Sequence, residues 1–168
     1  MTYLVPPLEE SLDPGDILDG CPIPQVEHFD LFDATKLVAN CGLCRVIVLT
    51  QTCDLANQKT TRVMVALMHD AERLVRDGIV KAADVRGPIR AARVFGWYYL
   101  PRHGASGLPE SVVDLRQVHT LPRGILEALR EHGARRARVG PLFREHLARH
   151  FADTYSRIGL PEPYETEP

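Results

Sequence analysis

Polar side chains of several kinds follow one another at the centre of this chain: two hydroxyls, an amide, a thiol and a carboxylate, contributed by Thr50, Gln51, Thr52, Cys53 and Asp54. The residues just before them, 45–49, are mostly β-branched or aliphatic and predict a buried strand. A core strand that delivers polar groups at its end is a common way to build a site on a rigid scaffold. We therefore expect a site at the exit of strand 45–51, with Gln51 and Thr52 as ligand-binding residues.

Cys53 carries the most nucleophilic group of this stretch. The thiolate is the reactive form, so thiol catalysis needs a nearby base or a positive field. Asp54 would oppose that field, and either His69 or His119 would have to serve as the base. The alternative is that Cys53 is a small buried hydrophobic residue and that Asp54 caps a turn through backbone hydrogen bonds.

Other groups that could bind a metal are weaker candidates. Cys41 and Cys44 form a C-x-x-C motif, which is half of a structural zinc site, and Cys21 is the thiol that could complete it. His146 and His150 lie four residues apart on a predicted helix, where solvated or capping roles are expected. We expect neither a metal nor a cofactor, and we leave a zinc site at the C-x-x-C motif as the alternative.

Charge is distributed unevenly along the chain. Residues 1–40 contain eight acids and one lysine, a net charge of −7, and residues 121–160 contain eight arginines and four acids, a net charge of +4. Either the two ends attract each other in the fold or are simply solvated, or the arginine-rich end binds a polyanion such as RNA. In the second case the nucleic-acid contacts would come from Arg135, Arg136 and Arg138, although the pI of about 6.4 is low for a nucleic-acid-binding domain.

The length of 168 residues and the 45% hydrophobic content predict one globular domain over residues 1–160. Residues 161–168 are acidic and proline-rich and are expected to be disordered. No apolar run is long enough for a membrane helix and no secretory signal is evident, so we expect a cytoplasmic protein with reduced thiols and no membrane contact. Its partner would be an unknown protein or RNA, and a homodimer is possible.

Two buried strands, 45–50 and 62–68, are expected to pair, because sequential strands are usually neighbours in a sheet. A first strand is predicted over 17–23 and is expected to end at Pro22 and Pro24. A long loop with a short strand or a helical turn is expected over 25–41. Further strands are predicted at 95–100, 112–119 and, as a basic edge strand, 135–139. Helices are predicted at 70–80, at 122–131 and from Pro141 onwards. This order predicts an α+β fold with a small, mainly antiparallel β-barrel, peripheral helices and a C-terminal amphipathic helix.

The run Thr50-Gln51-Thr52-Cys53-Asp54-Leu55 resembles a motif of a group of uncharacterised bacterial proteins. Those proteins also tend to end in a helix followed by a segment similar to Arg157-Ile158-Gly159-Leu160-Pro161. The resemblance extends over most of the chain and implies a bacterial protein, but the group has no established activity.

A second resemblance is to PemK/MazF-type toxins of toxin–antitoxin systems. It rests on Gly15-Asp16-Ile17, on Arg45 opening a strand that ends at Thr50, and on the following strand 62–68. The resemblance implies an SH3-like barrel that cleaves single-stranded RNA as a dimer, with Arg45 as the phosphate-stabilising residue. Val46 stands where those proteins have a proline, so the fold could carry over without the ribonuclease activity.

Three hypotheses for function follow. The first is a binding or accessory module whose ligand meets the polar residues at the exit of strand 45–51. The second is an RNA-cleaving or nucleic-acid-binding relative of the toxins, in which Arg45 and a base such as His69 act near Thr50. The third is a cysteine-dependent enzyme that uses Cys53, with Asp54 beside it. Whether the chain is an enzyme at all is left open by the sequence.

Overall fold

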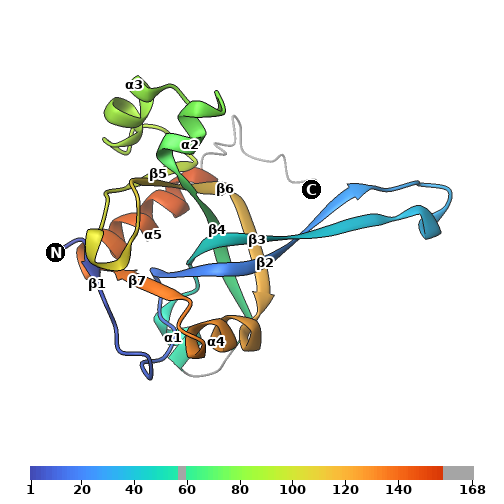
Figure 1. Cartoon of the computed structure of the whole chain (residues 1–168), viewed down its shortest axis with the longest axis horizontal. Coiled ribbons are helices and arrows are strands. Elements are labelled where there is room, and N and C mark those ends of the chain that lie inside the picture. Colours follow the sequence, from blue (N-terminus) through green and yellow to red (C-terminus); the bar gives the residue numbers. More distant parts are fainter. Residues whose placement is uncertain (57–59, 157–168) are drawn as a thin grey trace, which may run out of the picture.

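A computed structural model describes residues 1–56 and 60–156 of the chain (Figure 1). Its strands are β1 (Tyr3–Leu4), β2 (Asp16–His28), β3 (Val38–Val48), β4 (Arg62–Asp70), β5 (Trp97–Leu100), β6 (Ser111–Pro122) and β7 (Arg135–Val139). Its α-helices are α1 (Thr52–Ala56), α2 (Ala71–Arg76), α3 (Ala82–Asp84), α4 (Arg123–Glu131) and α5 (Pro141–Tyr155). Three short helical turns, η1 (Ala34–Lys36), η2 (Val85–Ile89) and η3 (Gly104–Ser106), complete the described elements.

The strands form one antiparallel sheet in the order β1-β7-β2-β3-β4-β6-β5. The predicted pairing of strands 45–50 and 62–68 is confirmed, because Val46, Ile47 and Val48 of β3 lie opposite Leu67, Ala66 and Val65 of β4. The α+β class and the antiparallel sheet are thus as expected. The strand 135–139 is also present, but it is not an edge strand, because β1 pairs with it on one side and β2 on the other.

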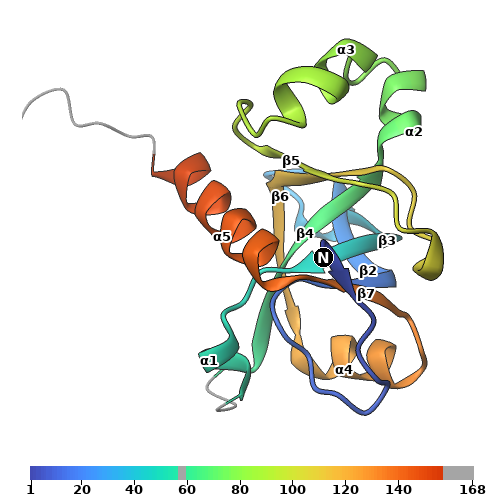
Figure 2. The ribbon, with the colours of Figure 1, turned by 90° about the vertical axis from the view of Figure 1, so that its left-hand side faces the viewer.

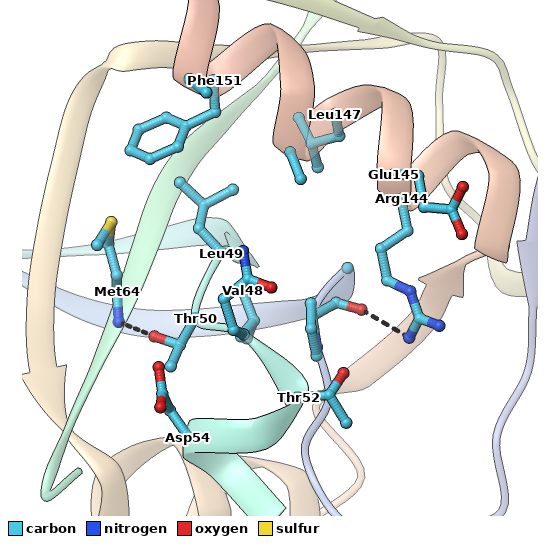
Figure 3. A pocket seen from close by; sticks show the side chains of 15 residues that line it. Val48, Leu49, Thr50, Thr52, Asp54, Met64, Arg144, Glu145, Leu147 and Phe151 are labelled. Atoms are coloured by element: carbon cyan, nitrogen blue, oxygen red, sulfur yellow. Dashed lines mark hydrogen bonds between the residues drawn. The ribbon is translucent and has the colours of Figure 1, made fainter. Parts of the chain in front are cut away.

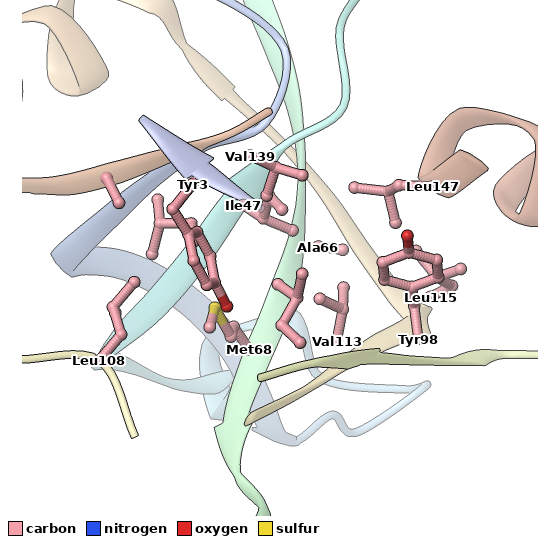
Figure 4. Close-up of a cluster of buried hydrophobic side chains, with 13 residues drawn as sticks. Tyr3, Ile47, Ala66, Met68, Tyr98, Leu108, Val113, Leu115, Val139 and Leu147 are labelled. Carbon is pink, nitrogen blue, oxygen red and sulfur yellow. The ribbon is translucent and has the colours of Figure 1, made fainter. Parts of the chain in front are cut away.

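Each face of the sheet buries its own apolar cluster, as the alternation of side chains along a strand requires. One cluster contains Ile47, Ala66, Val113 and Val139 and is closed by Leu147 of α5 (Figure 4). The opposite cluster contains Val46, Val48 and Val65 and is closed by Leu126 of α4. A third, smaller cluster contains Ala71 and Leu74 of α2, Val85 and Ile89 of η2, and Trp97 and Val112 of the sheet. The segment with α2 and α3 lies at one end of the molecule, beyond β5 (Figure 2). Among the described residues, no helix has the length and apolar character needed to cross a bilayer.

The sheet is strongly curved but remains open. No ladder joins β1 to β5 among the strands of residues 1–56 and 60–156. The two edges are instead linked by a side chain, because the hydroxyl of Tyr3 donates a hydrogen bond to the carbonyl of Pro101, with an O–O distance of 2.7 Å. The expected closure into a barrel is therefore not observed.

A two-stranded arm leaves the body of the protein where β2 and β3 continue beyond their other neighbours (Figure 1). β2 pairs with β7 only over Asp16–Leu18, and β3 pairs with β4 only over Val46–Val48. The long loop expected over 25–41 is in part replaced by strand, since residues 25–28 and 38–41 belong to β2 and β3. The helical turn expected as an alternative to a short strand within this segment is present as η1. Pro22 and Pro24 do not end the first strand, because prolines are tolerated in a strand that has a free edge.

An ion-pair cluster fastens the N-terminal segment to β7. Asp16 is fully buried, and both of its oxygens accept hydrogen bonds from Arg138, at 2.7 and 3.1 Å. Arg135 donates to the same carboxylate at 3.3 Å and to the carbonyl of Glu10 at 2.9 Å. The acidic and basic ends of the chain therefore attract each other in the fold, as one of the two interpretations of the charge pattern expected.

We expect Arg138→Ala to destabilise the protein by about 3–5 kcal/mol, because it leaves the buried carboxylate of Asp16 without its main partner. Arg136→Ala, half of whose side chain is exposed, is the matched control and should cost no more than about 1 kcal/mol. Urea unfolding followed by circular dichroism measures both. Equal losses of unfolding free energy in the two variants would show that the buried ion pair stabilises the protein no more than the exposed one.

Candidate functional site

The end of β3 is fixed by hydrogen bonds to β4. The N–H of Leu49 donates to the carbonyl of Met64 at 2.9 Å, and the N–H of Met64 donates to the hydroxyl oxygen of Thr50 at 2.7 Å. The carbonyl of Gln51 then accepts from the N–H groups of Asp54 and Leu55, which starts helix α1. The hydroxyl of Thr50 therefore takes the place of a main-chain acceptor for β4. The chain turns from β3 into α1 directly after it.

A cleft of about 540 Å3 opens beside this turn, between the exit of β3 and helix α5 (Figure 3). Its apolar walls come from Val48, Leu49, Met64, Leu147, Ala148, Phe151 and Ala152. Its polar rim comes from Thr50, Gln51, Thr52, Asp54, Arg144 and Glu145, and the turn Pro14–Gly15 forms the remaining wall. The volume falls within the range of roughly 300–1,000 Å3 that is usual for small-molecule sites.

Gly15 is required in that wall. Its φ of +83° lies in the left-handed region, and a Cβ there would approach the Cβ of Val139 to 3.2 Å. Its N–H donates to the carbonyl of Val48 at 2.8 Å, while its carbonyl accepts from the N–H of Val139 at 2.9 Å. The turn therefore joins β3 to β7 through main-chain hydrogen bonds, and it gives the cleft a rigid side.

The rim of the cleft favours cations over anions. Its one arginine, Arg144, is already paired with the carboxylate of Asp13 and contacts the carbonyl of Pro14 at 3.5 Å. Asp54 and Glu145 form no ion pair within residues 1–56 and 60–156. Within the described part of the chain, Asp54 and Glu145 thus add two carboxylates without a cationic partner to the rim of a largely apolar cavity.

Four of the residues expected at the exit of the strand, Thr50, Gln51, Thr52 and Asp54, line this cleft together. Cys53 lies beside them in sequence but is not among the lining residues. It is exposed, and its Sγ lies 3.8 Å from Oδ1 of Asp54. The alternative of a buried Cys53 is therefore wrong.

Arg45 lies away from the cleft, at the root of the arm. Its guanidinium group forms an ion pair with Asp19, with an Nε–Oδ1 distance of 2.5 Å. Arg136 donates to the other oxygen of the same carboxylate at 2.6 Å. Hydrogen bonds from these two arginines outweigh the effect of burial, which by itself would raise the pKa of Asp19, and lower that pKa below its ordinary value.

His69 lies at the far end of β4, in a half-buried position near Asp114 and Arg116. Burial lowers the pKa of its imidazole, and the charge of Asp114 only partly offsets this effect. The carboxylate of Asp114 is itself held by Arg116 and Gln117, at 2.9 Å from each donor nitrogen. The structure therefore separates His69 from the cleft, whose lining residues include no histidine.

The three arginines expected to contact nucleic acid face the N-terminal segment. The side chains of Arg135 and Arg138 are 3% and 7% exposed, and both bind Asp16. Arg136 is half exposed and is paired with Asp19. A nucleic-acid role for these residues stays a prediction, but the guanidinium groups of Arg135 and Arg138 are already used inside the fold.

Helix α5 supplies the part of the cleft that the sequence did not point to. Its spacing predicted an apolar stripe with Leu147 and Phe151, and these two side chains do face the sheet. The same stripe continues into the cleft wall, which only the packing of α5 beside the β3 exit could reveal. The expectation for His150 was wrong, because this residue is buried and its Nε2 donates to the carbonyls of Val94 and Trp97.

Cys21 and Cys44 lie opposite each other on β2 and β3, near Cys41. Nevertheless, no group of three or more His, Cys, Asp or Glu side chains arranged to hold a metal is found among the described residues. Comparison of the chain with protein-family models and with curated proteins finds no match. The geometry of the cleft is therefore the main guide to function.

Thr50→Val should destabilise the protein by about 1–3 kcal/mol, because the half-buried N–H of Met64 loses its acceptor. Thr50→Ser keeps the hydroxyl and should recover most of this loss. Thermal and urea unfolding of the two variants measure the difference. If valine and serine behave alike, the hydroxyl of Thr50 has no structural role, and a chemical one becomes more attractive.

His69 should titrate with a pKa below its ordinary value of 6.5, because burial disfavours the imidazolium form. Folding then favours neutral His69, so the stability that this residue contributes is present above pH 6.5 and decreases as the pH falls through that value. An NMR titration of the His69 ring measures the pKa directly. A midpoint above 6.5 would indicate that Asp114, and not burial, dominates its environment.

Proposed function

We propose that this protein is a binding or accessory module, and that its ligand occupies the cleft between the exit of β3 and helix α5. The observation that carries the proposal is the composition of that cleft. An apolar cavity with a few convergent polar groups is the usual form of a small-ligand or side-chain site. Here the polar groups are those of Gln51, Thr52 and Asp54, which lie in the turn after β3 and in the first residues of α1.

The rim suggests which chemistry the ligand has. Asp54 and Glu145 offer carboxylates, while the charge of Arg144 is already matched by Asp13. A ligand with an apolar body would displace water from Leu49, Met64 and Phe151. A cationic or hydrogen-bond-donating end would then meet the carboxylates. We therefore propose an amphipathic ligand with an amine-like end, either a small molecule or a basic side chain of a partner protein.

The two enzymatic alternatives receive less support. A ribonuclease of the PemK/MazF type would need an arginine and a base on one concave surface, whereas Arg45 is paired with Asp19 outside the cleft and His69 lies near Asp114. The open sheet also differs from the closed barrel of those toxins. A thiol enzyme would need a positive field at the sulfur of Cys53, and the neighbouring carboxylate of Asp54 opposes such a field. A cytoplasmic location rests on composition alone.

Phenethylamine is a suitable probe, because it joins an aromatic body to a primary amine. We expect it to shift the backbone amide NMR signals of Gln51–Leu55 and Leu147–Ala152, with a Kd of about 1 mM, which is ordinary for a ligand of this size. Phenylpropionate, which has a carboxylate in place of the amine, should bind at least about tenfold more weakly because of repulsion by Asp54 and Glu145.

Ala148→Phe should abolish the binding, because Ala148 is exposed in the cleft wall and a larger side chain would fill the cavity. Arg149→Phe places the same aromatic side chain one residue further along α5, at a position that is 83% exposed and outside the cleft. This control variant should bind phenethylamine normally. Equal binding by both variants, or stronger binding of phenylpropionate than of phenethylamine, would contradict the proposal.

A further inference from the structure

The arm formed by β2 and β3 has one face that is wholly apolar. Register places Pro22 opposite Leu43, Pro24 opposite Cys41, and Val26 opposite Ala39. Side chains of paired residues point to the same face of a ribbon, and every second residue repeats that face. Five of these six residues are exposed and Pro22 is half-buried. Val26 and Leu43 leave 68% and 76% of their surface in solvent.

The other face of the arm has a different character. Near the body it carries Cys21 and Ile23, which are buried in the core. Towards the tip it carries Gln25 and Asn40, which are exposed and polar, and Asn40 donates to Glu27 at 2.5 Å. The arm is therefore amphipathic along its projecting part, although nothing in the described structure covers its apolar face. Exposed apolar patches of this kind usually mark interaction sites.

The charges at the two ends of the arm are opposite. At the root, Arg45 and Arg136 share the single carboxylate of Asp19, which leaves a net charge of +1. Arg45 lies on the same side of β3 as Leu43, because the two residues are two positions apart. Near the tip, residues 27–36 contain three acids and one lysine, a net charge of −2.

We propose that two copies of this chain dimerise by packing the apolar faces of their arms against each other in antiparallel orientation. A two-fold axis through the middle of the arm makes the same patch serve both copies, as closed dimers require. The antiparallel orientation places the acidic tip of one arm beside the basic root of the other. This charge complementarity is what selects a second copy of the chain as the partner.

The axis of such a dimer passes close to Cys41. This residue lies about midway along β3 between the root at Arg45 and the tip at Lys36, and its side chain belongs to the apolar face. The two Cys41 thiols would thus lie near each other across the interface. Cys44 belongs to the opposite face, and Cys53 lies on the body beyond the other end of β3.

Sedimentation equilibrium of the full chain between about 1 and 100 µM measures the oligomeric state over the range in which modest protein interfaces associate. We expect a dimer that Val26→Asp and Leu43→Lys weaken about tenfold or more, because each buries a charge in the interface. Gln25→Lys alters the polar face of the same arm and is the matched control. All three residues are exposed, so thermal unfolding of the dissociated monomers, measured below the dissociation constant of the dimer, should be unchanged.

A short bismaleimide adds a second, independent test, because each of its rings takes up one thiol. It should link two chains through Cys41, so that Cys41→Ser abolishes the covalent dimer while Cys53→Ser retains it. A wild-type chain that stays monomeric at every concentration would overturn the proposal and leave the arm to a different protein. A dimer that survives Val26→Asp and is not linked through Cys41 would also overturn it, because an edge-to-edge pairing through β3 does not need Val26.

Discussion

The buried pair of Asp16 and Arg138 is the interaction on which the rest of the structure depends. A carboxylate that is fully removed from solvent is tolerated only when its charge and its lone pairs are satisfied. Arg138 binds both oxygens, Arg135 adds a third contact, and the N–H of Asp13 donates to Oδ2 at 3.0 Å. The last of these bonds closes the turn that precedes β2, so that one ion-pair cluster fixes both the sheet and the N-terminal segment.

The cleft inherits its shape from this cluster. The turn held by Asp16 presents Pro14 and Gly15 as one wall, and Asp13 in the same turn holds Arg144 of α5 on the other side. Ion pairs thus hold the acidic N-terminal segment against the basic residues of β7 and α5, and a cavity remains between the turn at residues 13–16 and α5. This arrangement explains why the cleft is more negative than the local sequence of α5 suggests: its arginine is neutralised from the N-terminal side.

Strand β3 connects the two surfaces that we consider functional. The strand ends at Val48, which together with Leu49 belongs to the apolar wall of the cleft, and the polar rim begins directly after them at Thr50. The first residues of β3, from Val38 to Leu43, form half of the projecting arm. Between them, Val46–Val48 are buried in the sheet. A dimer built through the arms would therefore leave both clefts open, since the two surfaces lie at opposite ends of the same strand.

Sequence patterns predicted those parts of this protein that depend on local periodicity. The aliphatic run before Thr50 indicated a core strand and a polar exit, and the spacing along residues 141–155 indicated α5. The arm was missed because Pro22, Pro24 and the mixed residues that follow are typical of loops, and only pairing over a long distance turns them into strands. The partners of Arg135, Arg138 and Arg45 were also beyond reach, because an arginine that binds phosphate and one that binds a buried carboxylate look alike in sequence. The last residues of the predicted C-terminal helix, including Ile158, and the expected tail 161–168 lie outside the described residues.

Hydrogen exchange of the native chain, followed by mass spectrometry of peptides, tests most directly whether the buried ion pairs make the N-terminal segment part of the core. Our account predicts that amides of residues 13–18 exchange as slowly as those of β7 and β4, because all three open only when the protein unfolds globally. Fast exchange of residues 13–18 while β3 and β4 stay protected would contradict it. In that case residues 13–18 would open without global unfolding, and the cleft would lack a fixed wall.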